Sequence, residues 1–197
     1  PMLVDGNKIS QAWSPAPEDV DANIATAQST ATNAATAATN AQNSANTANS
    51  AIASIASDNI LSASEKPNER SRWNDITNEK SGIVGQANTY GISTELTNYN
   101  NAFQSLATYL NNGTTWTTGV PTWIADASLA TNTVIVGSTY RTNWNNYFST
   151  RQILLNAIYA KAKTLADAAQ GTANSKVQTF FTTSTPTAVT IGDLWYN

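Results

Sequence analysis

The chain has 197 residues, of which 12% are charged, and its formal net charge at pH 7 is −3. It contains no histidine and no cysteine, which excludes disulfides, thiol chemistry and the side chain that most often acts as a base near neutral pH. Without a basic surplus, nucleic acid is not an expected partner, and no stretch approaches the roughly 18 consecutive apolar residues of a membrane span. We therefore expect no cofactor, no bound metal and no catalytic residues.

Residues 1–19 are predicted to form a short extended or irregular N-terminal segment. The Asp-Gly-Asn sequence at positions 5–7 has turn chemistry, and Pro15 and Pro17 disfavour a helix before them. The first helix is therefore expected only after Pro17. The chain starts with proline rather than methionine, and we interpret it as a fragment of a longer protein.

The next segment, residues 20–61, is dominated by small apolar residues that lie alternately four and three positions apart. This is the spacing of a coiled-coil seam. Each seam alanine buries little more than one methyl group, worth about 0.8 kcal/mol, so the helix must lie closely against other helices. The predicted oligomer seam consists of Ile24, Ala27, Ala31, Ala34, Ala38, Ala41, Ala45, Ala48, Ile52 and Ile55.

Two arrangements suit a seam of such small residues, a parallel homotrimer and a tight helical hairpin. We favour self-association as a homotrimer, because no second alanine seam of equal length follows in the chain. No charged side chain occurs between positions 22 and 57, so ion pairs beside the seam cannot select the partner. Ile24 at one end and Ile52 with Ile55 at the other are expected to fix the register.

Two other interpretations of this segment stay open. Its richness in alanine, asparagine, serine and threonine is also typical of disordered linkers. An ice-binding helix would need a regular ladder of threonines at a period near 11 residues. Thr36 and Thr47 fit such a ladder, but Thr26 is followed at that spacing by Ala37, which argues against ice binding.

Charged residues, tryptophan and large aliphatic side chains return at Asp58, and we expect a domain boundary near this point. Three amphipathic stretches follow, joined by connections that allow antiparallel neighbours. Residues 62–175 are therefore predicted to form an antiparallel three-helix bundle. The predicted fold class is mainly α: a long Ala-rich coiled-coil-like helix, then this bundle, with short extended or β segments at both ends.

The first helix of the bundle is expected to open at residues 62–65, whose S-x-x-E pattern is that of a capping box. Trp73 and Ile76 share its apolar face. Gly82 and Gly85 are expected to end it.

Two acidic pairs on this helix are candidate catalytic carboxylates, Glu65 with Glu69 and Asp75 with Glu79. Paired carboxylates can hydrolyse glycosides. Both pairs, however, lie at i, i+4 spacing on faces with basic neighbours, and we interpret them as solvated surface charges.

A second helix is predicted from Ser93 to Leu110, with a stop at the Asn-Asn-Gly sequence 111–113. A third is predicted from about Ser138 to Gln170, with Gly171 as its C-cap. Each carries an apolar stripe at 3–4 spacing. The stripes are Leu96, Tyr99, Phe103, Leu106 and Leu110 on the second helix, and Tyr140, Trp144, Tyr147, Arg151, Leu154, Ile158, Leu165 and Ala169 on the third.

Residues 112–137 form the one long connection within the predicted bundle, and loops of this length are often functional. Trp116 and Trp123 could form a ligand platform, since aromatic faces stack on sugar rings and peptides. The alternative is that both rings cover the core of the bundle, and we favour it. The β-branched run 134–136 is predicted to be a short strand or a plug of the core.

Three sequence patterns occur in an order seen in a known class of protein. They are IASDNILSASEKP at 55–67 with Arg72-Trp73 after it, YRTNW at 140–144 leading into the helix that reaches Ile158, and a Thr/Pro-rich stretch at 180–187 followed by GDLW at 192–195. These patterns resemble segments of large tail-tip, central-fibre or host-specificity proteins of tailed bacteriophages and prophages. In those proteins the chain usually continues beyond the last tryptophan.

The resemblance implies a virion component with a structural role. Such a segment would oligomerise, contact other tail proteins and position receptor-contact domains. Residues 176–197 would then be a linker and the first strand of a following domain. An alternative is a host-surface binding module that contacts its receptor through loop 112–137. No functional residue is carried over, because the matching motifs are architectural.

Overall fold

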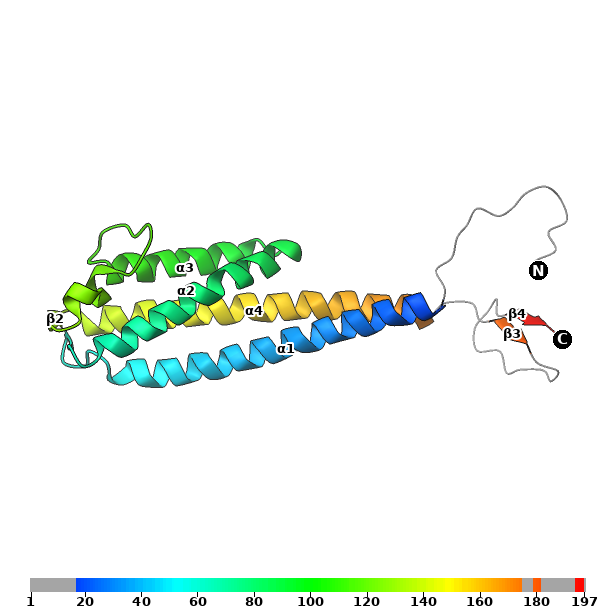
Figure 1. The fold of residues 1–197 in the computed structure, drawn as a ribbon, viewed down its shortest axis with the longest axis horizontal. Coiled ribbons are helices and arrows are strands. Elements are labelled where there is room, and N and C mark those ends of the chain that lie inside the picture. Colours follow the sequence, from blue (N-terminus) through cyan, green and yellow to red (C-terminus); the bar gives the residue numbers. More distant parts are fainter. Residues whose placement is uncertain (1–16, 175–178, 182–193, 197) are drawn as a thin grey trace. The chain divides into compact units, whose positions relative to one another are not determined.

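The computed structural model describes residues 17–174, 179–181 and 194–196 (Figure 1). Most of the predicted N-terminal segment and most of the predicted C-terminal linker therefore lie outside the described residues. The protein is mainly helical, as predicted. It divides into two compact units, one formed by residues 31–162 and the other by the described residues before 31 and after 162.

Four helices account for most of the described residues, among which short strands join in two pairs. The helices are α1 (Pro17–Ser54), α2 (Lys66–Thr89), α3 (Thr94–Leu110) and α4 (Gly137–Asn174). The strands are β1 (Ile60–Leu61), antiparallel to β2 (Thr133–Val134), and β3 (Thr179–Phe181), parallel to β4 (Leu194–Tyr196). Two 3-10 turns, η1 (Thr122–Ile124) and η2 (Asp126–Ser128), lie in the long connection.

The predicted end of α2 is wrong, because the helix continues through Gly82 and Gly85. A glycine inside a helix costs about 1 kcal/mol relative to alanine, but the helix beyond these two positions is held by packing, with Ala87 fully buried. The helix ends instead at Thr89, two residues before Gly91, which has a φ of 68°. There the N–H of Ile92 donates to the carbonyl of Ala87 at 2.9 Å, which is a Schellman motif.

The same motif ends α3 at the predicted stop. Asn112 adopts a φ of 57°, and the N–H of Gly113 donates to the carbonyl of Thr108 at 2.9 Å. The predicted C-cap of α4 is wrong, because this helix runs through Gly171 to its end at residue 174. A glycine near the end of an apolar pattern is thus not a sufficient stop signal.

The core of the 31–162 unit contains the predicted apolar faces of α2 and α3. Trp73 stacks on Phe103 with ring centroids 5.3 Å apart, and Ile76 is buried beside them. The predicted stripe of α4 is buried from Tyr140 to Ile158.

Beyond Ile158 the predicted stripe of α4 is partly wrong, because Leu165 is 49% exposed. Ala162 and Ala166 are buried instead, one in each compact unit. The buried face thus continues in steps of four residues through alanine, whose small side chain lets helix backbones approach closely. The larger apolar side chain, Leu165, therefore does not mark the buried face of α4 here, because the partner helix is lined with alanine.

The end of α1 and the start of α4 are held together by a set of contacts that we name the α1–α4 joint, residues 55–61 and 133–141. Strands β1 and β2 pair here, so of the predicted run 134–136 only Val134 lies in a strand, and only Ile135 is buried. Asn59, with a φ of 63°, accepts hydrogen bonds from the N–H of Ile135 at 2.9 Å and of Gly137 at 3.0 Å. Arg141 donates to the carbonyl of Ala56 at 3.3 Å, beside the last turn of α1.

Gly137 is essential to this joint because of the space around it. A Cβ atom at this position would lie 2.0 Å from the carbonyl oxygen of Ala56. That oxygen belongs to the backbone, so it cannot move aside as the end of a flexible side chain could.

We expect Gly137→Ala to lower the free energy of unfolding by about 1 to 3 kcal/mol, the usual cost of overpacking. Gly85→Ala is the matched control, because a Cβ atom there meets nothing within 4 Å and alanine favours the helix by about 1 kcal/mol. Chemical denaturation followed by circular dichroism measures both. Equal effects of the two substitutions would contradict the tight contact at the joint.

Candidate functional site

The structure places the predicted oligomer seam against the chain's own α4, in an antiparallel helix pair (Figure 1). The side chain of Gln152 donates to the carbonyl of Ala38 at 3.3 Å, and Arg151 donates to that of Ala41 at 3.5 Å. In the 31–162 unit, Ala38, Ala41, Ala45, Ile52 and Ile55 are 1 to 8% exposed, and Ala31, Ala34 and Ala48 are half-buried. In the other unit, Ile24 is buried and Ala27 half-buried. The contact is that of a helical hairpin, and self-association stays a prediction.

The two tryptophans of the predicted ligand platform both lie on the core. The ring of Trp116 packs edge to face on Trp73 at 5.3 Å, and its Nε1 donates to the carbonyl of Gly119 at 3.1 Å. The ring of Trp123 packs edge to face on Tyr109 at 5.0 Å. Both rings are half-buried, so each covers core residues and keeps an exposed part. Contact with a ligand stays a prediction.

The prediction that Glu69 is a solvated surface charge is wrong, because its side chain is completely buried. Its carboxylate accepts a hydrogen bond from the hydroxyl of Tyr140 and forms an ion pair with Arg72. The guanidinium of Arg72 also lies 5.5 Å from the centre of the Trp144 ring. The sequence contained a signal for this burial, since Glu69 lies four residues before Trp73 and therefore on the same apolar face of the helix.

Burial is the largest influence on the carboxyl group of Glu69, and it raises the pKa to about 7. The positive charge of Arg72 and its hydrogen bond act in the opposite direction, while the nearby charge of Glu65 adds to the rise. The buried carboxyl group therefore holds its proton to a higher pH than an exposed glutamate does.

A second, partly buried carboxylate connects α2 to α4. Glu79 forms a two-pronged ion pair with Arg151, and it accepts a hydrogen bond from the hydroxyl of Tyr147 at 3.1 Å. The hydroxyls of Tyr147 and Tyr99 lie 3.4 Å apart, and burial raises the pKa of Tyr99 to about 12. Glu79 is thus only partly exposed, which differs from its predicted role as a surface charge.

A buried lysine attaches the long connection to α2. The Nζ of Lys66 donates to the carbonyl of Ser128 at 2.8 Å and to the hydroxyl of Thr133 at 2.7 Å. Burial lowers its pKa. Because these acceptors are neutral, the lysine acts as a hydrogen-bond anchor for the loop rather than as half of an ion pair.

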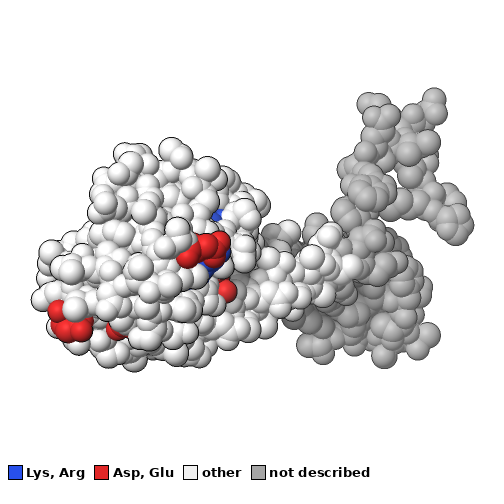
Figure 2. Space-filling model, turned by 60° about the vertical axis from the view of Figure 1, so that its left-hand side comes forward, with Lys and Arg blue, Asp and Glu red and all other residues white. Residues whose placement is uncertain are grey.

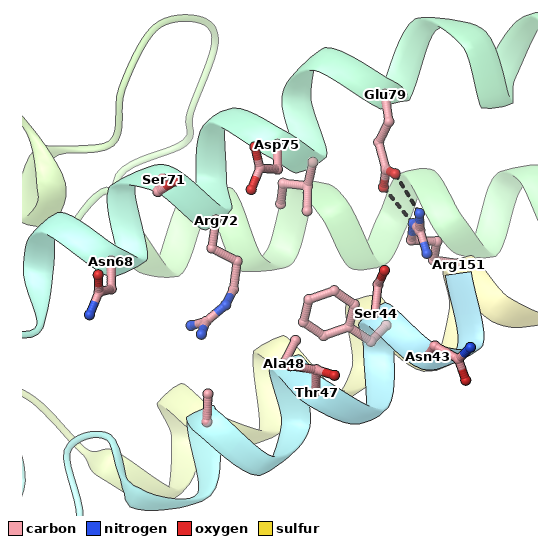
Figure 3. Close-up of a pocket in the computed structure, with 13 residues that line it drawn as sticks. Asn43, Ser44, Thr47, Ala48, Asn68, Ser71, Arg72, Asp75, Glu79 and Arg151 are labelled. Carbon is pink, nitrogen blue, oxygen red and sulfur yellow. Dashed lines mark hydrogen bonds and ion pairs between the residues drawn. The ribbon is translucent and has the colours of Figure 1, made fainter. Parts of the chain in front are cut away.

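A groove of about 690 Å³ lies between α1 and α2, and side chains of α4 form part of its lining (Figure 3). We name it the α1–α2 groove. Figure 3 shows the side chain of Arg72 extending from α2 toward α1, and Arg151 paired with Glu79. Its lining consists of Asn43, Ser44, Thr47, Ala48, Ala51, Asn68, Ser71, Arg72, Asp75, Ile76, Glu79, Phe148 and Arg151.

The lining of the groove combines neutral polar side chains with two positive and two negative ones. Across the face drawn in Figure 2, charged side chains gather in a few small clusters on an otherwise uncharged surface. Within the described part of the chain, no three acidic residues lie close enough together to hold a metal ion. None of the described helices is long and apolar enough to cross a membrane. The chemistry available in the groove is hydrogen bonding.

Comparison with known proteins identifies one informative similarity. The chain is 35% identical over 119 residues to a tail fibre protein of Enterococcus phage phiEF24C. The match covers 60% of this chain and 6% of that protein, so the chain corresponds to a small part of its relative. No family model matches the sequence, and no solved structure matches it.

The buried carboxyl group predicts a pH dependence of stability. Because the pKa of Glu69 in the folded chain exceeds its usual 4.5, the folded state binds this proton more tightly than the unfolded state. The stabilisation is fully present below about pH 4.5 and is lost as the pH rises through about 7. We expect this group to lower the free energy of unfolding by roughly 2 to 3 kcal/mol between pH 5 and pH 8.

Glu69→Gln should remove that loss, because the amide stays neutral at every pH. Glu95→Gln, a substitution elsewhere on the chain, should leave it in place. Urea denaturation at a series of pH values measures the effect. The same pH dependence in the wild type and in Glu69→Gln would contradict the assignment.

The seam predicts a different response at two adjacent alanines. Ala38→Asp puts a charge where the side chain is 7% exposed and should cost about 3 kcal/mol of stability. Ala37 is exposed, so Ala37→Asp should cost no more than the helix propensity difference, up to about 0.7 kcal/mol. Thermal and urea denaturation compare the two, and equal losses would argue against burial of the seam by α4.

Proposed function

We propose that this chain is a non-enzymatic structural segment of a phage tail tip or central tail fibre, and so a virion component. The observation that carries the proposal is the 35% identity to a phage tail fibre protein. The sequence patterns that resemble tail proteins support it, because the pattern at 55–67 forms one side of the α1–α4 joint. Residues such as Asn59 and Arg141 have packing and capping roles there, as expected of architectural motifs.

The segment is further proposed to self-associate as a homotrimer, to contact other tail proteins and to position receptor-contact domains. The support is the composition of α1, which has no charged side chain from position 22 to its end. Between positions 31 and 54 many of these uncharged side chains are exposed, so copies of the chain could approach without charge repulsion. Because α4 covers much of the seam, the copies would meet along the exposed side of α1.

A second candidate is a host-surface binding module that uses loop 112–137. Its support is the partial exposure of Trp116 and Trp123, both of which are fixed by contacts with other rings. In a trimer the loop would be present three times, and avidity would strengthen a weak individual contact.

Light scattering on the full chain over a range of concentrations tests the structural proposal. We expect a mass of about three times the 20.9 kDa of one chain, with a helical circular dichroism spectrum. A monomeric mass at every concentration would contradict self-association.

If loop 112–137 binds the host surface, Trp123→Ala should abolish attachment of the labelled chain to host cells while its mass stays unchanged.

A further inference from the structure

We propose that the α1–α2 groove binds an uncharged, hydroxyl-rich ligand, a neutral oligosaccharide, through polar side chains from both helices. This site is separate from the loop with the two tryptophans. It does not depend on the proposed trimer.

The hydroxyl groups of α1 fall into two sets. Those of the first set donate to a carbonyl of the same helix, namely Thr26, Thr30, Thr39, Ser50 and Ser54. Ser44 and Thr47 line the groove and have no hydrogen-bond partner among the described residues. Their hydroxyls are therefore available to donate to, and accept from, a ligand.

The opposite wall offers complementary groups. Asn68, Ser71 and Asp75 of α2 line the groove, and their side chains likewise have no partner within the described part of the chain. Arg72 commits one nitrogen to Glu69 and has further N–H donors on the side that faces the groove in Figure 3. The two walls thus present amide, hydroxyl, guanidinium and carboxylate groups, which together match sugar hydroxyls, since these both donate and accept.

The charges in the groove favour a neutral ligand over an ion. Each of the two guanidinium groups is already paired with a carboxylate, Arg72 with Glu69 and Arg151 with Glu79. An anion would have to compete with these carboxylates and would be repelled by Asp75. A neutral ligand can use the same groups as hydrogen-bond partners without separating the ion pairs.

The size and the lining of the groove suit a short oligosaccharide. A volume of about 690 Å³ falls in the usual range of ligand sites, roughly 300 to 1,000 Å³. In the lining, Ala48 is half-buried and Ala51 is exposed, and their methyl groups give apolar surface against which the C–H face of a sugar ring can pack. The seam residues Ala41 and Ala45 of α1 are buried elsewhere in the core, so binding requires no opening of the helix pair.

Saturation-transfer difference NMR on the full chain, with maltotetraose and chitotetraose as probes, tests this proposal. We expect saturable binding of at least one tetrasaccharide. Thr47→Val and Asp75→Leu should each weaken it roughly three- to tenfold, the effect of losing one hydrogen bond. Thr36→Val is the matched control, since Thr36 is an exposed α1 threonine outside the groove, and it should bind as the wild type does.

Three results would overturn the proposal. The first is no saturable binding of either sugar at millimolar concentration. The second is binding that Thr36→Val weakens as much as Thr47→Val does. The third is competition by inorganic phosphate, because it would identify an anion site. Circular dichroism of every variant separates these outcomes from loss of the fold.

Discussion

The close contact between Gly137 and the carbonyl of Ala56 is the constraint on which the rest of the 31–162 unit depends. It determines where α4 starts relative to the end of α1, while Asn59 and Arg141 hold both segments in that position. Because helices are stiff, this one point of attachment sets the register of α1 and α4 within the 31–162 unit. Ala38 consequently lies beside Gln152, and the small seam residues meet a partner that can approach them closely.

Two carboxylates of α2, the buried Glu69 and the partly buried Glu79, orient this helix on the framework. Glu69 reaches Tyr140, and Glu79 reaches Arg151, so two turns of α2 are attached to α4 at separate points. A buried ion pair adds little net stability, because the cost of desolvation offsets the attraction, but losing one partner is costly. Their effect is to hold α2 at a defined distance from α1, and the α1–α2 groove lies in the space that remains.

The functional proposals use different surfaces of the same helix. One side of α1 is covered by α4, another lines the groove, and much of the remainder is exposed and uncharged. A segment of a long fibre has to contact its own copies and its neighbours in the assembly, and a helix without charges permits such contacts. The similarity to a phage tail fibre protein, over 6% of that protein's length, agrees with a modular segment within a much longer chain.

The sequence by itself determined the helical class, the apolar faces of α2 and α3, and the stop at Asn112, because periodicity and αL-capable residues act locally. It also indicated that one side of α1 must be buried. Only the tertiary structure decided what buries it, since an alanine seam fits any close helix, whether in the same chain or in another copy. The partner of the buried Glu69 was likewise beyond local reasoning, because the hydroxyl that donates to its carboxylate lies 71 residues further along the chain. Periodicity identifies the face of a helix that is buried, whereas the partner depends on contacts between residues distant in the sequence.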